Sequence, residues 1–127
     1  MYISATLAST LFFAAVRACI ECPHPGNFTG NLLPYEVLQS ASCGIESAPP
    51  NATYAKLSKD YFNPPDESPC NAPITVTNPK TNKIVTAYVV GECKTCSGDD
   101  VYLSQPGYSV LSKRRRKPYT AVEWTFA

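Results

Sequence analysis

The chain has 127 residues, a formal charge of +1, six cysteines, twelve prolines and a single histidine. A hydrophobic share of 44% and a charged share of 17% are typical of one globular domain and exclude a disordered chain. The small charge argues against a general nucleic-acid binder, and one histidine excludes a histidine-rich metal centre. The sequence has no G-x-G-x-x-G or P-loop motif, which argues against a nucleotide-binding domain.

An apolar segment opens the chain. Residues 3–16 (ISATLASTLFFAAV) carry no charge but are fewer than the roughly 18 to 20 residues needed to span a bilayer. Val16 and Ala18 occupy the −3 and −1 positions of a signal-peptidase site. We therefore expect a signal peptide over residues 1–18, and a secreted, extracellular single domain over residues 19–127 without a membrane anchor. The alternative is a buried N-terminal helix.

Six cysteines follow the expected cleavage site. An even number of cysteines in an oxidising compartment predicts three disulfides, but six cysteines allow 15 pairings and the sequence does not choose among them. The two C-x-x-C pairs could instead form a zinc or redox site. We favour disulfides because four-thiolate zinc sites belong mainly to reducing compartments, and we expect no metal and no cofactor. The cysteines are Cys19, Cys22, Cys43, Cys70, Cys93 and Cys96.

Residues 19–35 are rich in Pro, Gly and Asn and predict an irregular lead-in. His24 lies there between two prolines, so we expect an exposed loop residue. Two sequons, N-F-T at Asn27 and N-A-T at Asn51, predict glycosylation at the surface.

The middle of the chain offers short elements. A strand that ends in a glycine turn is expected around residues 41–44. The apolar residues at positions 54, 57, 61 and 62 have the spacing of a helix two turns long. The Asn63-Pro64-Pro65 sequence then stops any helix.

The second half predicts strands. Residues 74–77 alternate between apolar and polar side chains, and residues 78–83 (NPKTNK) supply a turn. Residues 84–90 follow, with Val85, Ala87 and Val89 on one face and Thr86 and Tyr88 on the other. Residues 122–126 alternate strictly, which puts Val122, Trp124 and Phe126 inside. The sequence therefore predicts a small, all-β, disulfide-linked domain.

The order of these segments resembles a known family. Cys43-Gly44 is followed by A-x-L-S-x-x-x-F over residues 55–62, by Cys70, and by the hairpin of residues 74–90. Then come G-E-C-x-x-C (91–96), V-Y-L-S (101–104) and V-E-W-T-F (122–126). Over about residues 26 to 127, the chain resembles the double-psi β-barrel superfamily, which includes rare lipoprotein A-like proteins, loosenins, barwin and the first domain of expansins.

The resemblance implies a closed six-stranded barrel with a groove across one face. It favours a Cys43–Cys70 disulfide. It leaves the other four cysteines either as the close pairs Cys93–Cys96 and Cys19–Cys22, or as two crossed pairs.

Glycosidic cleavage generally requires two carboxyl groups. Catalytic relatives carry one Asp in V-x-D-x-C and another in D-L-S, and the matching positions here are Gly91 and Tyr102. Glu92 would point to the opposite face from Gly91, and Asp100 would lie about 6.5 Å along the strand from Tyr102. We therefore expect no enzymatic activity, and interpret Asp99-Asp100 as a solvated turn.

The groove could still bind a ligand. Tyr102 could stack on sugar rings, while Asp100 and Thr29 could hydrogen-bond to sugar hydroxyls. A second candidate site is the basic run Lys113, Arg114, Arg115, Arg116 and Lys117. The run is either a solvated loop, a patch that binds polyanions, or a dibasic protease site. We rank the protease site last, because cleavage would detach the last strand.

Three functions compete. The first is an expansin- or loosenin-like module that binds, and could loosen, cell-wall polysaccharide without hydrolysis. The second is a protein-binding module, either a protease inhibitor or a host-directed effector, because the superfamily includes both papain inhibitors and plant defence proteins. The third is an enzyme with displaced acids. We order them in this sequence and expect a monomer, whose partner is a polysaccharide or an extracellular protein.

Overall fold

The computed structural model describes residues 24–35, 43, 52–63, 68–114 and 116–127. The expected signal peptide, Cys19, Cys22, Asn51 and most of the expected strand over 41–44 lie outside these residues. The described elements are β1 (Phe28–Tyr35), β2 (Thr53–Ser58), the 3₁₀-helix η1 (Lys59–Phe62), β3 (Pro73–Asn78), β4 (Lys83–Cys93), β5 (Val101–Ser104), α2 (Gln105–Leu111) and β6 (Ala121–Phe126). The structure is therefore mostly β, as the sequence predicts. The irregular lead-in expected over residues 19–35 is wrong for residues 28–35, which form β1 because β5 and β6 hydrogen-bond to both of its edges.

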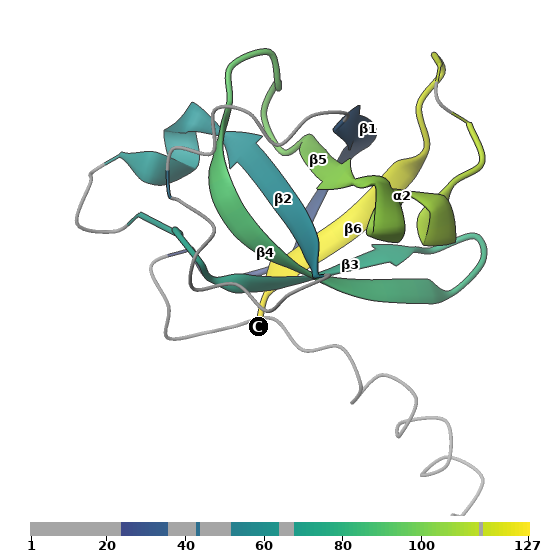
Figure 1. Cartoon of the computed structure of the whole chain (residues 1–127), viewed down its shortest axis with the longest axis horizontal. Coiled ribbons are helices and arrows are strands. Elements are labelled where there is room, and N and C mark those ends of the chain that lie inside the picture. Colours follow the sequence, from purple (N-terminus) through teal and green to yellow (C-terminus); the bar gives the residue numbers. More distant parts are fainter. Residues whose placement is uncertain (1–23, 36–42, 44–51, 64–67, 115) are drawn as a thin grey trace, which may run out of the picture.

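The six described strands form a closed barrel in the order β1-β5-β2-β4-β3-β6 (Figure 1). β1 pairs with β5, and β2 with β4, in parallel, while the other four neighbouring pairs are antiparallel. Neighbours in this order are mostly distant in sequence, so the barrel depends on long-range pairing. Its closure leaves no strand edge unpaired among these six strands.

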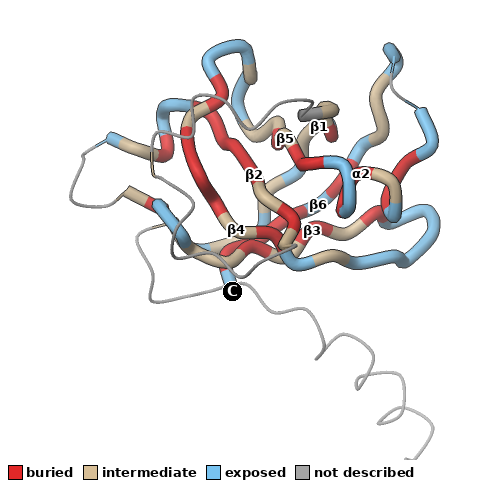
Figure 2. The backbone as a smooth tube through the Cα atoms, viewed as in Figure 1, coloured by how far each residue is buried: buried red, intermediate tan, exposed pale blue. Residues whose placement is uncertain are grey.

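Alternating side chains fill the interior of the barrel. Each strand contributes fully or almost fully buried apolar residues, among them Leu32, Leu57, Val76, Val89, Leu103 and Trp124. The helix α2 adds Tyr108 and Leu111 to the same core. Figure 2 shows the buried residues along β2, β4 and β6, with exposed residues at the β3–β4 turn. The shared face predicted for Val85, Ala87 and Val89 is confirmed and points to the core. The inward positions predicted within residues 122–126 are confirmed as well.

The β3–β4 hairpin forms as its sequence predicts. The Asn78 side chain accepts a hydrogen bond from the backbone N–H of Lys80 at 2.9 Å, which makes an Asx turn. Asn82 takes the left-handed conformation, with φ of 62°, that asparagine tolerates better than most residues. The turn chemistry is local, so the sequence alone was sufficient to find it.

The helix expected over residues 54–62 is wrong. Residues 53–58 are strand β2, and only residues 59–62 turn, as a 3₁₀-helix. β2 lies between β4 and β5, so both of its edges are hydrogen-bonded, and Ala55 and Leu57 alternate into the core. These non-local partners outweigh the weak helical spacing.

His24 also differs from expectation. Its ring is partly buried and lies 5.2 Å from the ring of Tyr61 and 5.7 Å from that of Phe126. The flanking prolines indicated a loop correctly, but the aromatic cluster that covers the loop comes from β6 and η1. The burial of His24 could therefore not be predicted from the residues next to it in sequence.

Candidate functional site

Gly91 and Tyr102, the two positions that the family resemblance matches to aspartates of catalytic relatives, lie on either side of one residue, Lys56. On β2, Lys56 is opposite Gly91 of β4 and opposite Tyr102 of β5. Tyr102 in turn is opposite Leu33 of β1. The neighbours of Lys56 and Tyr102 along their strands point into the core, so these two side chains point outward. We call Leu33, Tyr102, Lys56 and Gly91 the outer row.

A β-bulge sets the register of this row. Ala55 pairs with Val89, but the next residue, Lys56, pairs with Gly91, so Val90 is the extra residue. Without the bulge, Gly91 would share the inward face of Val89. The bulge thus brings Gly91 to the outside, opposite Lys56.

Lys56 is the residue that sequence reasoning missed. It is only 8% exposed although it points out of the barrel, and burial lowers the pKa of its ammonium group from the usual value. The signal that could have found it is the alternation Y-A-K-L-S over residues 54–58, which a strand divides into an apolar inner and a polar outer face.

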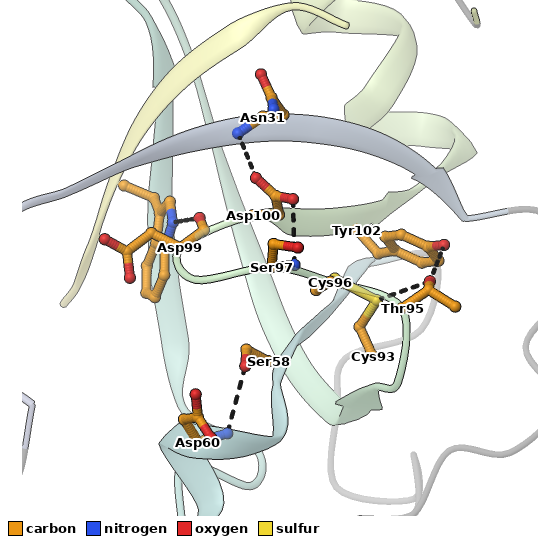
Figure 3. Close-up of a disulfide and its surroundings, with 11 residues drawn as sticks. Asn31, Ser58, Asp60, Cys93, Thr95, Cys96, Ser97, Asp99, Asp100 and Tyr102 are labelled. Carbon is orange, nitrogen blue, oxygen red and sulfur yellow. Dashed lines mark hydrogen bonds between the residues drawn. A yellow bond between two sulfur atoms is a disulfide. The ribbon is translucent and has the colours of Figure 1, made fainter. Parts of the chain in front are cut away.

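Tyr102 is anchored by the disulfide loop beside it. Its hydroxyl shares a hydrogen bond of 2.9 Å with the hydroxyl of Thr95 (Figure 3). Thr95 lies between Cys93 and Cys96, which form a disulfide. The ring of Tyr102 is partly buried, so one part stays accessible while the hydroxyl end is fixed.

The acidic pair at 99 and 100 is not a freely solvated turn. Asp100 accepts hydrogen bonds from the backbone N–H groups of Asn31 at 3.0 Å and Ser97 at 3.3 Å (Figure 3). The Asp99 carboxylate accepts a hydrogen bond from the Tyr61 hydroxyl, and its backbone carbonyl accepts one from the Trp124 indole at 2.8 Å. The expectation missed Asn31, Tyr61 and Trp124 because they lie 69, 38 and 25 residues away in sequence from the aspartates that they contact. Both carboxylates hold the turn against the barrel.

The hydroxyl of Tyr61 is held in its neutral form by this contact. Burial, the hydrogen bond to Asp99 and the negative charges of Asp99 and Asp60 all raise the pKa of Tyr61 far above its usual value. Tyr61 therefore acts as a permanent donor to Asp99 at neutral pH.

Thr29 lies away from Tyr102. It is exposed on β1 and pairs with Glu123 of β6, whereas Tyr102 pairs with Leu33, four residues further along β1. Four residues of strand span about 13 Å. The structure therefore does not bring Thr29 and Tyr102 together, although both lie on the outer face of the barrel.

Two disulfides are described. Cys43–Cys70 is the pair that the family resemblance favours. Cys93–Cys96 is a close pair, as in the first of the two alternatives for the other four cysteines. The second C-x-x-C pair is thus oxidised and is not a thiolate zinc site. Within the described ranges, no group of three His, Cys, Asp or Glu side chains could hold a metal ion, and no helix is long and apolar enough to span a membrane.

The basic run lies at a different place. Lys113, Arg114, Arg116 and Lys117 are exposed and line an open hollow of about 950 Å³ together with Lys83 from the β3–β4 hairpin. Arg115 lies outside the described residues. The sequon residue Asn27 is exposed and directly precedes β1.

The sequence matches no protein-family model and no curated protein. Among solved structures, the chain is similar to the crystal structure of apo Clavibacter michiganensis expansin, with a TM-score of 0.66 and 18% identity over 80% of this chain. The fold is expansin-like. An Asp→Asn variant of the same expansin, solved in complex with cellohexaose, matches equally well. This chain spans 50% of the length of either structure. The similarity confirms the six-stranded double-psi barrel that the sequence resemblance implies.

Proposed function

We propose that this protein is a secreted, non-catalytic module that binds a neutral cell-wall polysaccharide on the outer face of its barrel. The observation that carries the proposal is the outer row, in which Lys56 lies between the two positions where lytic relatives carry carboxylates. The expansin-like fold supports a glycan as the ligand class, since an expansin variant of this fold was solved in complex with cellohexaose.

The outer face has side chains suited to sugars. Tyr54 of β2 pairs with Tyr88 of β4. Tyr54 lies two residues before Lys56, and Tyr88 lies three residues before Gly91. Both alternate with core residues, so they point outward, as Tyr102 does. All three are partly buried. Tyrosine offers an apolar ring for the C–H face of a sugar and a hydroxyl for its polar edge.

The same row argues against hydrolysis. Glycosidic cleavage passes through an oxocarbenium-like, positively charged transition state that two carboxyl groups normally assist. Here the strand positions on either side of Lys56 carry a glycine and a tyrosine, and neither residue supplies a carboxyl group. The nearby carboxylate of Asp100 is already held by two backbone N–H groups. Binding without bond cleavage is the function that this chemistry supports best.

An extracellular location fits the two described disulfides, because disulfides persist in oxidising compartments. The signal peptide expected over residues 1–18 would direct the chain there.

The test is binding of the disulfide-intact protein to insoluble cellulose, chitin and β-glucan, with released soluble sugar measured in the same samples. We expect saturable binding to at least one polymer, no sugar release, and a loss of about ten-fold in affinity for Tyr102→Ala. Tyr119→Ala is the matched control, because Tyr119 is a partly buried tyrosine of the loop before β6 and does not lie on the outer row.

Three results would contradict the proposal. Sugar release that Asp100→Asn abolishes would indicate an enzyme with displaced acids. If Tyr102→Ala and Tyr119→Ala change the affinity for the polymer equally, the polymer does not bind at the outer row. Absence of binding to all three polymers would favour a protein partner, to be sought first among extracellular proteases.

A further inference from the structure

The basic hollow is assembled from segments that are distant in sequence. We use this name for the hollow lined by Lys83, Lys113, Arg114, Arg116 and Lys117. Lys83 begins β4, and the other four follow α2, so the hollow lies between the β3–β4 hairpin and the loop before β6. Figure 1 shows this hairpin and this loop on the same side of the barrel. No acidic side chain is among the described residues that line it. Within the described part of the chain, none of the five forms a salt bridge.

The loop that carries the basic run is tied to the barrel. The buried Tyr108 donates its hydroxyl hydrogen to the carbonyl of Arg114. The N–H of Arg114 donates to the Ser112 hydroxyl at 3.0 Å, and that hydroxyl shares a hydrogen bond of 2.7 Å with Thr120. The backbone at Arg114 is thereby positioned before any ligand arrives, which lowers the entropic cost of binding.

Basic side chains gather at the hollow without acidic partners. Of the eleven basic residues in the sequence, six are Lys83 and residues 113–117. Elsewhere among the described residues, four lysines accompany five acidic residues, so the charge there is close to balanced. The hollow is therefore the part of the described surface that attracts an anion most strongly.

The lining indicates the kind of anion. The cations are exposed and come from two separate segments of the chain, unlike the converging buried donors that hold one compact phosphate. Thr81 and Thr120 also line the hollow, and Val110, 45% exposed, supplies an apolar surface. Several exposed cations, hydroxyls and an apolar surface match a polymer that carries many carboxylates, hydroxyls and C–H faces. The site is concave, so a flat lipid headgroup layer fits it less well.

We propose that the basic hollow binds a linear acidic polysaccharide of the uronate class, at a site separate from the outer row. This inference does not rest on the proposed function, since it uses different residues and a different ligand chemistry. The protein would then hold neutral and acidic polymers on two different parts of one barrel.

The test measures binding of the disulfide-intact protein to polygalacturonate, and to the same polymer with its carboxylates methyl-esterified, in low and high salt. The deciding variant is Lys83→Gln, because Lys83 is remote from the basic run in sequence but lines the same hollow. Lys80→Gln is the matched control, since Lys80 is an exposed lysine of the same hairpin that does not line the hollow. Vesicles containing phosphatidylserine test the membrane alternative.

We expect Lys83→Gln to weaken polygalacturonate binding by about five-fold, and Lys80→Gln to change it less than about two-fold. Methyl esterification or high salt should abolish binding, because exposed charges are screened. Tyr102→Ala should leave it unchanged, which keeps this test separate from that of the outer row. Equal effects of the two lysine variants, equal binding to the esterified polymer, or binding to the vesicles but not to polygalacturonate would each overturn the proposal.

Discussion

Gly30→Ala is expected to destabilise the protein by about 3 kcal/mol. A Cβ atom at Gly30 would lie 2.2 Å from the carbonyl oxygen of Asp99 and 2.8 Å from the backbone nitrogen of Asp100. Both are backbone atoms, so no side chain can rotate away, and the turn must retreat by about 1 Å. This retreat strains the Trp124–Asp99 and Asn31–Asp100 hydrogen bonds. Overpacking costs about 1–3 kcal/mol and each weakened hydrogen bond about 1 kcal/mol.

Urea unfolding with the disulfides intact is the assay. With a slope of about 1–3 kcal/mol per molar for a small domain, the midpoint should fall by about 2 M. Gly98→Ala is the control: φ at Gly98 is +54°, but nothing lies within 4 Å of its added Cβ, so only backbone strain of about 1 kcal/mol is expected. If the two variants unfold at the same urea concentration, the close approach of the turn to β1 is not the reason for a glycine at position 30.

Two further predictions concern the disulfides and pH. The Cys43–Cys70 disulfide joins residues 27 apart in sequence, and the Cys93–Cys96 disulfide joins residues 3 apart. Replacing the first pair by alanine should lower the free energy of unfolding in urea by about 3.5 kcal/mol, and replacing the second pair should lower it by about 2 kcal/mol. Equal losses would contradict the argument that the longer loop gains more from its disulfide. Because the pKa of Tyr61 is raised in the folded protein, its contribution to stability is complete below pH 10 and is lost as the pH rises above 10. The slope of stability against pH between 9 and 11 should therefore be less negative in Tyr61→Phe, and an unchanged slope would refute this reading.

The parts of the fold that sequence reasoning found correctly are those with local causes. The β3–β4 hairpin has period-two alternation on both sides of an Asn-Pro turn, and its strands are neighbours in sequence. The inward face of β6 follows from the alternation of Val122, Trp124 and Phe126. In both cases, each residue's environment is set by residues a few positions away.

The incorrect expectations share the opposite cause. β2 was expected as a helix because its partners, β4 and β5, begin 30 or more residues later in the chain. The turn at Asp99 and Asp100 was expected to be solvated because Asn31 and Trp124, which contact it, come from β1 and β6. In a barrel of this strand order, most contacts that fix a side chain are non-local.

The sequence by itself determined the fold class, the hairpin and the superfamily resemblance, because these depend on residue identity and short-range pattern. The expectation that Gly91 and Tyr102 stand where catalytic relatives carry aspartates also comes from the sequence alone. Only the tertiary structure decided that Lys56 lies between those two positions, and that Lys83 joins the basic run around one hollow. The physical reason is that strand register, shifted here by a bulge at Val90, determines which distant side chains face each other. No local propensity encodes that register.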